Sequence, residues 1–117
     1  MNSNEAIAKL AYWTFRFRTA VYAKQQVNVV DINKDTKCNL GEWLNGEATQ
    51  IHGASPILAR CLTEHAAFHR EAYRVAAAVN SGNQGDVERL LAPGSPFFQA
   101  TKTVSDTIVE LFGSIDG

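Results

Sequence analysis

The chain has 117 residues, of which 45% are hydrophobic and 20% charged, and its formal net charge is −1. These values are typical of one globular domain, and we expect residues 1–117 to form a single helical domain. Without a basic stretch, nothing in the sequence supports binding to nucleic acid. No apolar run approaches the roughly 20 residues that span a bilayer, and the N-terminus lacks the pattern of a secretion signal. We therefore expect a cytoplasmic protein, not inserted into a membrane, whose cysteines are reduced.

The first predicted helix runs from about Asn4 to Lys24 and carries two adjacent apolar rows. The first row is Leu10, Trp13, Phe17 and Val21, and the second is Ala8, Tyr12, Phe15, Thr19 and Tyr22. Together they make a face wider than a helix needs for one packing contact. We therefore expect a second buried contact, with another copy of the chain, so that the protein is a homodimer.

A polar connection over residues 25–37 leads to a short predicted helix from Cys38 to about Gln50. Ser55 followed by Pro56 is a typical helix start, with serine as the cap and proline in the first turn. From there the apolar residues keep a 3.6-residue period to about Asn80, which predicts one long helix.

Ser81-Gly82-Asn83 stops that helix, and a short helix is predicted over Asp86–Ala92. Ser95-Pro96 repeats the cap-and-proline start, and the last helix follows it. The expected fold is all-α, an antiparallel four-helix bundle with a short extra helix.

His65 and His69 lie four residues apart on the long predicted helix, so both imidazoles share one face. Their row is otherwise apolar, which points both rings inward. Buried imidazoles need a metal, a carboxylate or a backbone carbonyl as partner. On spacing alone, both a metal site and a pair of core histidines bonded to their neighbours stay open.

Cys38 strengthens the metal hypothesis, because a thiolate at a helix start is stabilised by the helix dipole. One thiolate with two imidazoles is a ligand set typical of zinc, although structural zinc sites use four ligands. The second cysteine, Cys61, lies on the apolar stripe of the long helix, where a small core residue is the simpler interpretation.

The sequence Cys38-Asn-Leu-Gly-Glu-Trp43, followed at a distance by His65-Ala-Ala-Phe-His69, resembles the chemoreceptor zinc-binding (CZB) domain. The pattern of that family also has a His-x-x-aromatic element on the first helix. The resemblance covers about Glu5 to Phe112. It implies a four-helix bundle that binds zinc through three histidines and one cysteine, often as a dimer attached to chemoreceptors or diguanylate cyclases.

Cys38, His65 and His69 match three of the four ligands that the resemblance implies. The histidine place on the first helix aligns best with Tyr12, and a shifted alignment on Trp13 puts Leu10 there instead. A phenol, with a pKa near 10, is a poor zinc ligand unless the metal acidifies it. Three states stay open: three protein ligands plus water, a site with Tyr12 as the doubtful fourth ligand, and a metal-free site.

Catalysis at an open zinc position would need a general base, for which Glu64 and Glu42 are the candidates. Both are expected on the solvated surface, so we expect no enzyme. Asp31, Asn33 and Asp35 resemble a calcium loop, but Thr36 stands where that loop needs glycine.

The sequence therefore predicts a cytoplasmic regulatory domain that senses zinc or an oxidant through its Cys/His site. Its output would be chemotaxis or cyclic-di-GMP control, through a chemoreceptor or another signalling protein as partner. The alternative is a metal-free interaction or dimerisation module in which the hydroxyl of Tyr12 bonds His65 or His69.

Overall fold

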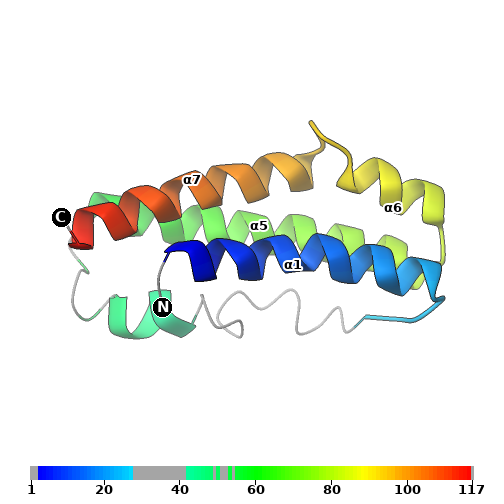
Figure 1. Ribbon diagram of the computed structural model, residues 1–117, viewed down its shortest axis with the longest axis horizontal. Helices are drawn as coiled ribbons and strands as arrows, with labels where there is room; N and C mark the ends of the chain where they lie inside the picture. The colour runs from blue at the N-terminus through cyan, green and yellow to red at the C-terminus, as the bar shows by residue number, and fades with distance from the viewer. Residues whose placement is uncertain (1–2, 28–41, 49, 51–52, 54, 117) are drawn as a thin grey trace.

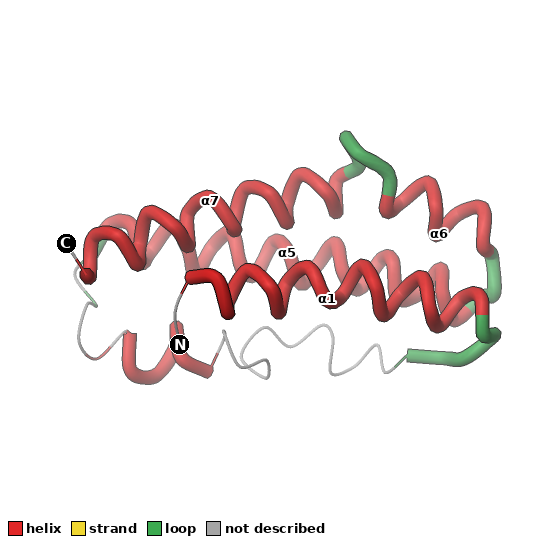
Figure 2. Tube along the Cα trace, viewed as in Figure 1, coloured by secondary structure: helices red, strands yellow, loops and turns green. Residues whose placement is uncertain are grey.

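The computed structural model describes residues 3–27, 42–48, 50, 53 and 55–116, and every regular element within these ranges is a helix. The elements are α1 (Ser3–Tyr22), the π-helix η2 (Leu44–Ala48), α5 (Pro56–Asn80), α6 (Gln84–Leu91) and α7 (Pro96–Asp116). The predicted all-helical class is confirmed (Figure 1). Figure 2 shows the described helices joined by short loops after α5 and after α6.

The long helix α5 has both of the ends that the sequence predicts. The Ser55 hydroxyl oxygen accepts a hydrogen bond from the Leu58 N–H at 3.3 Å, and Pro56 stands in the first turn. Beyond the other end, Gly82 takes a left-handed φ of 77°, which costs glycine little. The next helix, α6, begins two residues earlier than predicted, because the Asn83 side chain caps it by accepting from the Asp86 N–H.

Three long helices, α1, α5 and α7, lie side by side along the molecule (Figure 1). The C-terminal ends of α1 and α5 lie together, since Asn80 is hydrogen-bonded to Val27. The first turns of α5 lie near the end of α7, where Arg60 forms an ion pair with Glu110. Helix α7 therefore runs back along α5 in the opposite direction.

The core is built around aromatic side chains from all three long helices. The Phe97 ring contacts Phe17 at a centroid distance of 5.9 Å and Phe68 at 5.5 Å. Phe17 and Phe68 are completely buried. Because these rings come from α1, α5 and α7, their contacts tie the three helices together.

The two apolar rows of α1 have different surroundings. Leu10, Phe17 and Val21 of the first row are buried, and Trp13 packs partly buried against the same core. Every residue of the second row is exposed, and Phe15 reaches 64% exposure. One row therefore accounts for the packing of α1 within this chain, and the other is left on the surface.

The short helix predicted from Cys38 to about Gln50 is described only in part, and Cys38 lies outside the described residues. Glu42 and Trp43 form a helical turn that continues into the π-helix η2, where Leu44 and Ala48 are buried. The Trp43 ring stacks on Phe112 of α7, with centroids 4.9 Å apart and planes 13° apart. This stack fixes the turn before η2 against the last turns of α7.

None of the helices in the described part of the chain is both long enough and apolar enough to cross a membrane.

Candidate metal centre

The two predicted ligand histidines lie on the buried face of α5. His65 is completely buried and His69 is 2% exposed. Because they are one turn apart on one helix, their rings approach closely, with centroids 4.6 Å apart and planes 80° apart. The Phe68 ring packs edge-on against His69 at 5.4 Å. The inward orientation that the apolar row of α5 predicts is therefore the one observed.

The Nε2 atoms of His65 and His69 are 3.2 Å apart. Two nitrogens that each bind one tetrahedral zinc at about 2.05 Å lie about 3.3 Å from each other, so the pair fits a shared zinc ion. The same distance suits an N–H···N hydrogen bond, in which one ring donates its N–H and the other, neutral ring accepts it. The geometry of the pair therefore fits zinc without requiring it.

Further ligands would have to come from elsewhere in the protein. Within the described residues, no group of three or more His, Cys, Asp or Glu side chains is placed to hold a metal ion. Cys38 lies outside those residues, as do the acidic residues of the calcium-like stretch. The structure thus brings two of the predicted ligands together and leaves the position of the thiolate a prediction.

The histidine place on the first helix is taken by Tyr12 in one alignment and by Leu10 in the other, and the burial of these two residues can be compared. Tyr12 is 57% exposed and stacks on the exposed Phe15 ring at 6.0 Å, whereas Leu10 is 2% exposed. The burial pattern therefore favours the alignment on Trp13, which puts Leu10 in the histidine place. The sequence alone did not choose between the two alignments, because both rows of α1 are apolar.

Leu10 lies somewhat before the histidine pair along the bundle. Phe17 and Phe68 both contact Phe97. Leu10 and Cys61 precede Phe17 and Phe68, respectively, by seven residues, or about 10 Å of helix. Since α1 and α5 end together, Leu10 lies about level with Cys61, one turn before His65. A leucine side chain offers no donor atom to a metal.

Glu64 and Cys61 lie on α5 beside the histidine pair. Glu64 was expected on the solvated surface, but its side chain is only 18% exposed and lies 3.9 Å from Arg60. Burial raises the pKa of the Cys61 thiol to about 12, and the negative charge of Glu64 adds to the effect. Cys61 is completely buried in the core, as expected, and such a thiol is inert. Glu42, by contrast, is exposed, as predicted.

Residues 11–76, more than half of the chain, match the family model described as "Chemoreceptor zinc-binding domain". The chain belongs to this family. The matched range includes Tyr12, Cys38, His65 and His69, and Leu10 is the residue just before it. Membership in the CZB family assigns the chain a sensory or signalling role of the chemoreceptor type. Neither the curated proteins nor the solved structures include a match.

Proposed function

We propose that this CZB domain is a regulatory domain that senses zinc or an oxidant through Cys38, His65 and His69. One observation carries the proposal: the two Nε2 atoms lie 3.2 Å apart in a buried position, close to the separation of two nitrogens on one zinc ion. The family match supports it, because its range contains all three residues. No catalytic role is proposed for the site.

The three residues would hold zinc together with water or another ligand, since Leu10 carries no donor atom. Zinc bound there would keep the Cys38 sulfur as a thiolate. Depletion of zinc, or oxidation of this thiolate by a peroxide that takes up its two electrons, would remove that sulfur ligand. The consequence would be a change in how the segment around Trp43 packs on α7.

The proposed output is control of chemotaxis or of cyclic-di-GMP level through a partner signalling protein in the cytoplasm. The segment that carries Cys38 leads directly into Trp43, which stacks on Phe112 near the end of α7. A shift of that segment would therefore change the packing at the end of α7, where a partner protein could bind.

The test is the zinc content of untagged protein purified without chelator, measured by mass spectrometry of the metal. Wild-type protein is expected to hold nearly one zinc per chain, and His69→Gln and Cys38→Ser to lose it. Cys61→Ala is the matched control, because it removes a cysteine of the core and leaves the proposed ligands. Equal zinc in wild type and His69→Gln would refute the proposed site.

A metal-free interaction module is the second candidate, and the same distance favours it, because 3.2 Å also suits a hydrogen bond between His65 and His69. In that case no zinc binds at any added concentration. The Tyr12 hydroxyl is a weaker candidate for a bonding partner of the pair, since its side chain is 57% exposed.

We also propose that the domain forms a homodimer through the exposed row of α1. The stacked rings of Tyr12 and Phe15 lie on this row and are 57% and 64% exposed. Burying two such rings against a second copy would be favourable. Light scattering should show a dimer at tens of micromolar that Phe15→Glu dissociates, whereas Tyr73→Glu, at an exposed tyrosine of α5, leaves it intact. A wild-type monomer would contradict the dimer.

For the fold, we propose that residues 1–117 form one domain and that its full arrangement is the antiparallel four-helix bundle. The opposite directions of α5 and α7 support this arrangement, as does the packing of Trp43 and η2 on the bundle. The short α6 would then be the extra helix.

A further inference from the structure

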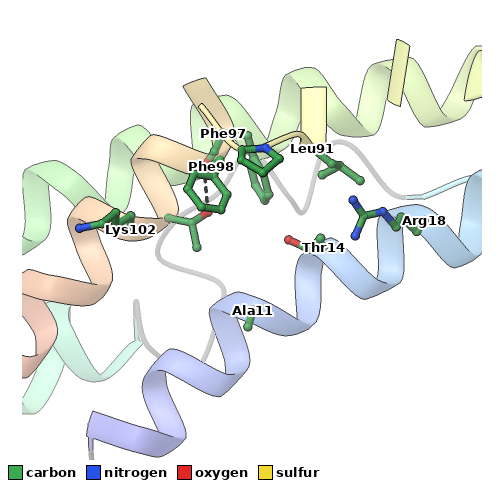
Figure 3. Close-up of a pocket in the computed structure, with 9 residues that line it drawn as sticks. Ala11, Thr14, Arg18, Leu91, Phe97, Phe98 and Lys102 are labelled. Atoms are coloured by element: carbon green, nitrogen blue, oxygen red, sulfur yellow. Dashed lines mark hydrogen bonds between the residues drawn. The ribbon is translucent and has the colours of Figure 1, made fainter. Parts of the chain in front are cut away.

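A groove with a volume of about 540 Å³ lies between α1 and the N-terminal half of α7, and neither His65 nor His69 is among the described residues that line it. Figure 3 shows Phe97, Phe98 and Leu91 on one side of it, and Ala11 and Thr14 of α1 on the other. This volume lies within the range of about 300–1,000 Å³ that is usual for small-molecule sites. Most of the lining is apolar, so the groove suits the hydrocarbon body of a ligand.

The charged residues of the groove have one sign. Arg18 and Lys102 line it and stand at opposite ends in the view of Figure 3, and the described residues that line it include no carboxylate. Thr14 and Thr101 add two hydroxyl groups. The Thr101 hydroxyl already donates to the Phe97 carbonyl at 2.8 Å, so the complement to a negative charge comes mainly from Arg18 and Lys102. The lining therefore complements a negative charge beside an apolar body.

Both cations are available to a ligand at small cost. Arg18 reaches Glu88 only at 3.4 Å, and its side chain is 45% exposed. Glu88 keeps a second partner if Arg18 turns away, because the Tyr22 hydroxyl donates to it at 3.2 Å. The pair of Lys102 with Asp106 is also exposed, and such surface pairs are weak and easily exchanged.

We propose that this groove binds a small amphipathic anion, a carboxylate carried on an aromatic or branched aliphatic body. The ring or chain lies against Phe97 and Phe98, and the carboxylate takes a charge-assisted hydrogen bond from the guanidinium of Arg18 or the ammonium of Lys102. The site is separate from the histidine pair, although the Phe97 wall contacts Phe68, which in turn contacts His69.

The test uses 2-naphthylacetate as the probe and neutral 2-naphthylacetamide as its matched control, each titrated into the full chain. Amide chemical shifts of Thr14 and Thr101 report on the groove. We expect saturable shifts with the anion at a dissociation constant on the order of 0.1–1 mM, and binding by the amide about tenfold weaker.

Variants locate the contact. Arg18→Gln or Lys102→Gln should weaken binding of the anion about tenfold, and Ala11→Leu, which fills the groove, should abolish it. Arg74→Gln removes an exposed charge of α5, away from the groove, and should change nothing.

Three results would overturn the proposal. Equal affinity for 2-naphthylacetate and 2-naphthylacetamide would show that the negative charge of the ligand does not contribute to binding. Absence of saturable shifts at 5 mM probe, about five times the largest expected constant, would remove the site. Shifts that the probe causes at other residues but not at Thr14 and Thr101 would place its binding elsewhere.

Discussion

The side-chain amide of Asn80 forms two hydrogen bonds with the backbone of Val27. Its Oδ1 accepts from the Val27 N–H at 2.8 Å, and its Nδ2 donates to the Val27 carbonyl at 2.9 Å. Asn80 is the last residue of α5, and Val27 follows the end of α1. The Asn80 amide therefore satisfies both backbone polar groups of Val27. These two bonds hold the chain that follows α1 against the end of α5.

Asn80→Ala should lower the free energy of unfolding by about 1–3 kcal/mol, because it leaves two partly buried backbone groups without their partners. Urea unfolding measures the loss, and hydrogen exchange of the Val27 amide should speed up in the variant. Gln84→Ala, at an exposed position nearby, is the control and should stay within about 0.5 kcal/mol of wild type. Unchanged exchange at Val27 would show that the two bonds contribute nothing in solution.

The stack of Trp43 on Phe112 allows tryptophan fluorescence to report how the segment from Cys38 to Trp43 packs on α7. In a Trp13→Phe background Trp43 is the only remaining tryptophan. Phe112→Leu should shift its emission to longer wavelength and destabilise the protein by about 1 kcal/mol, because a ring contact is lost and water gains access. Val109→Leu, at an exposed position of α7, should leave the emission unchanged. An identical emission maximum in Phe112→Leu would mean that Trp43 is not held on α7.

Cys61 should be unreactive in the folded protein. Its pKa is raised from 9.0 to about 12 by burial, so almost no thiolate forms at pH 8. In Cys38→Ser, Cys61 is the only thiol, and it should react with a disulfide reagent only when urea is added. Fast labelling in native buffer would contradict the burial of this side chain.

The raised pKa of Cys61 also affects the stability of the fold. The folded state keeps the Cys61 proton between pH 9 and about 12, whereas the unfolded state loses it. The unfolded state therefore binds fewer protons, and stability falls as the pH rises through this window. Cys61→Ala should lose stability at neutral pH through its cavity, yet show a flatter decline above pH 9. An equally steep decline in wild type and Cys61→Ala would mean that groups other than Cys61 cause the loss of stability above pH 9.

Local signals in the sequence were enough to predict the ends of the long helices. Ser55 and Pro56 begin α5, and the stop after Asn80 is also where predicted, because caps and prolines act within a few residues. The inward position of His65 and His69 was likewise predictable, since it follows from the 3.6-residue period of their own helix.

Features that depend on contacts between helices were not predictable in the same way. Both rows of α1 are apolar, and only the packing against Phe97 and its neighbours selects the row with Leu10 and Phe17 for the core. The partial burial of Glu64 was missed as well, because no local pattern in the sequence marks it. The cap formed by Asn83 was missed because the same residue also suits a helix stop.

The last prediction tests which residue of α1 faces the histidine pair. Leu10→His would place an imidazole in the buried row, about level with Cys61, where it can complete a tetrahedral set with His65, His69 and Cys38. Its zinc affinity should rise by about a hundredfold or more over wild type, measured by competition with a chromogenic chelator. Without zinc the variant should be less stable by roughly 1–3 kcal/mol, since it buries a polar ring. Tyr12→His is the matched control: because Tyr12 is exposed, it should leave the affinity unchanged. A gain in Tyr12→His with none in Leu10→His would instead place Tyr12 at the ligand position.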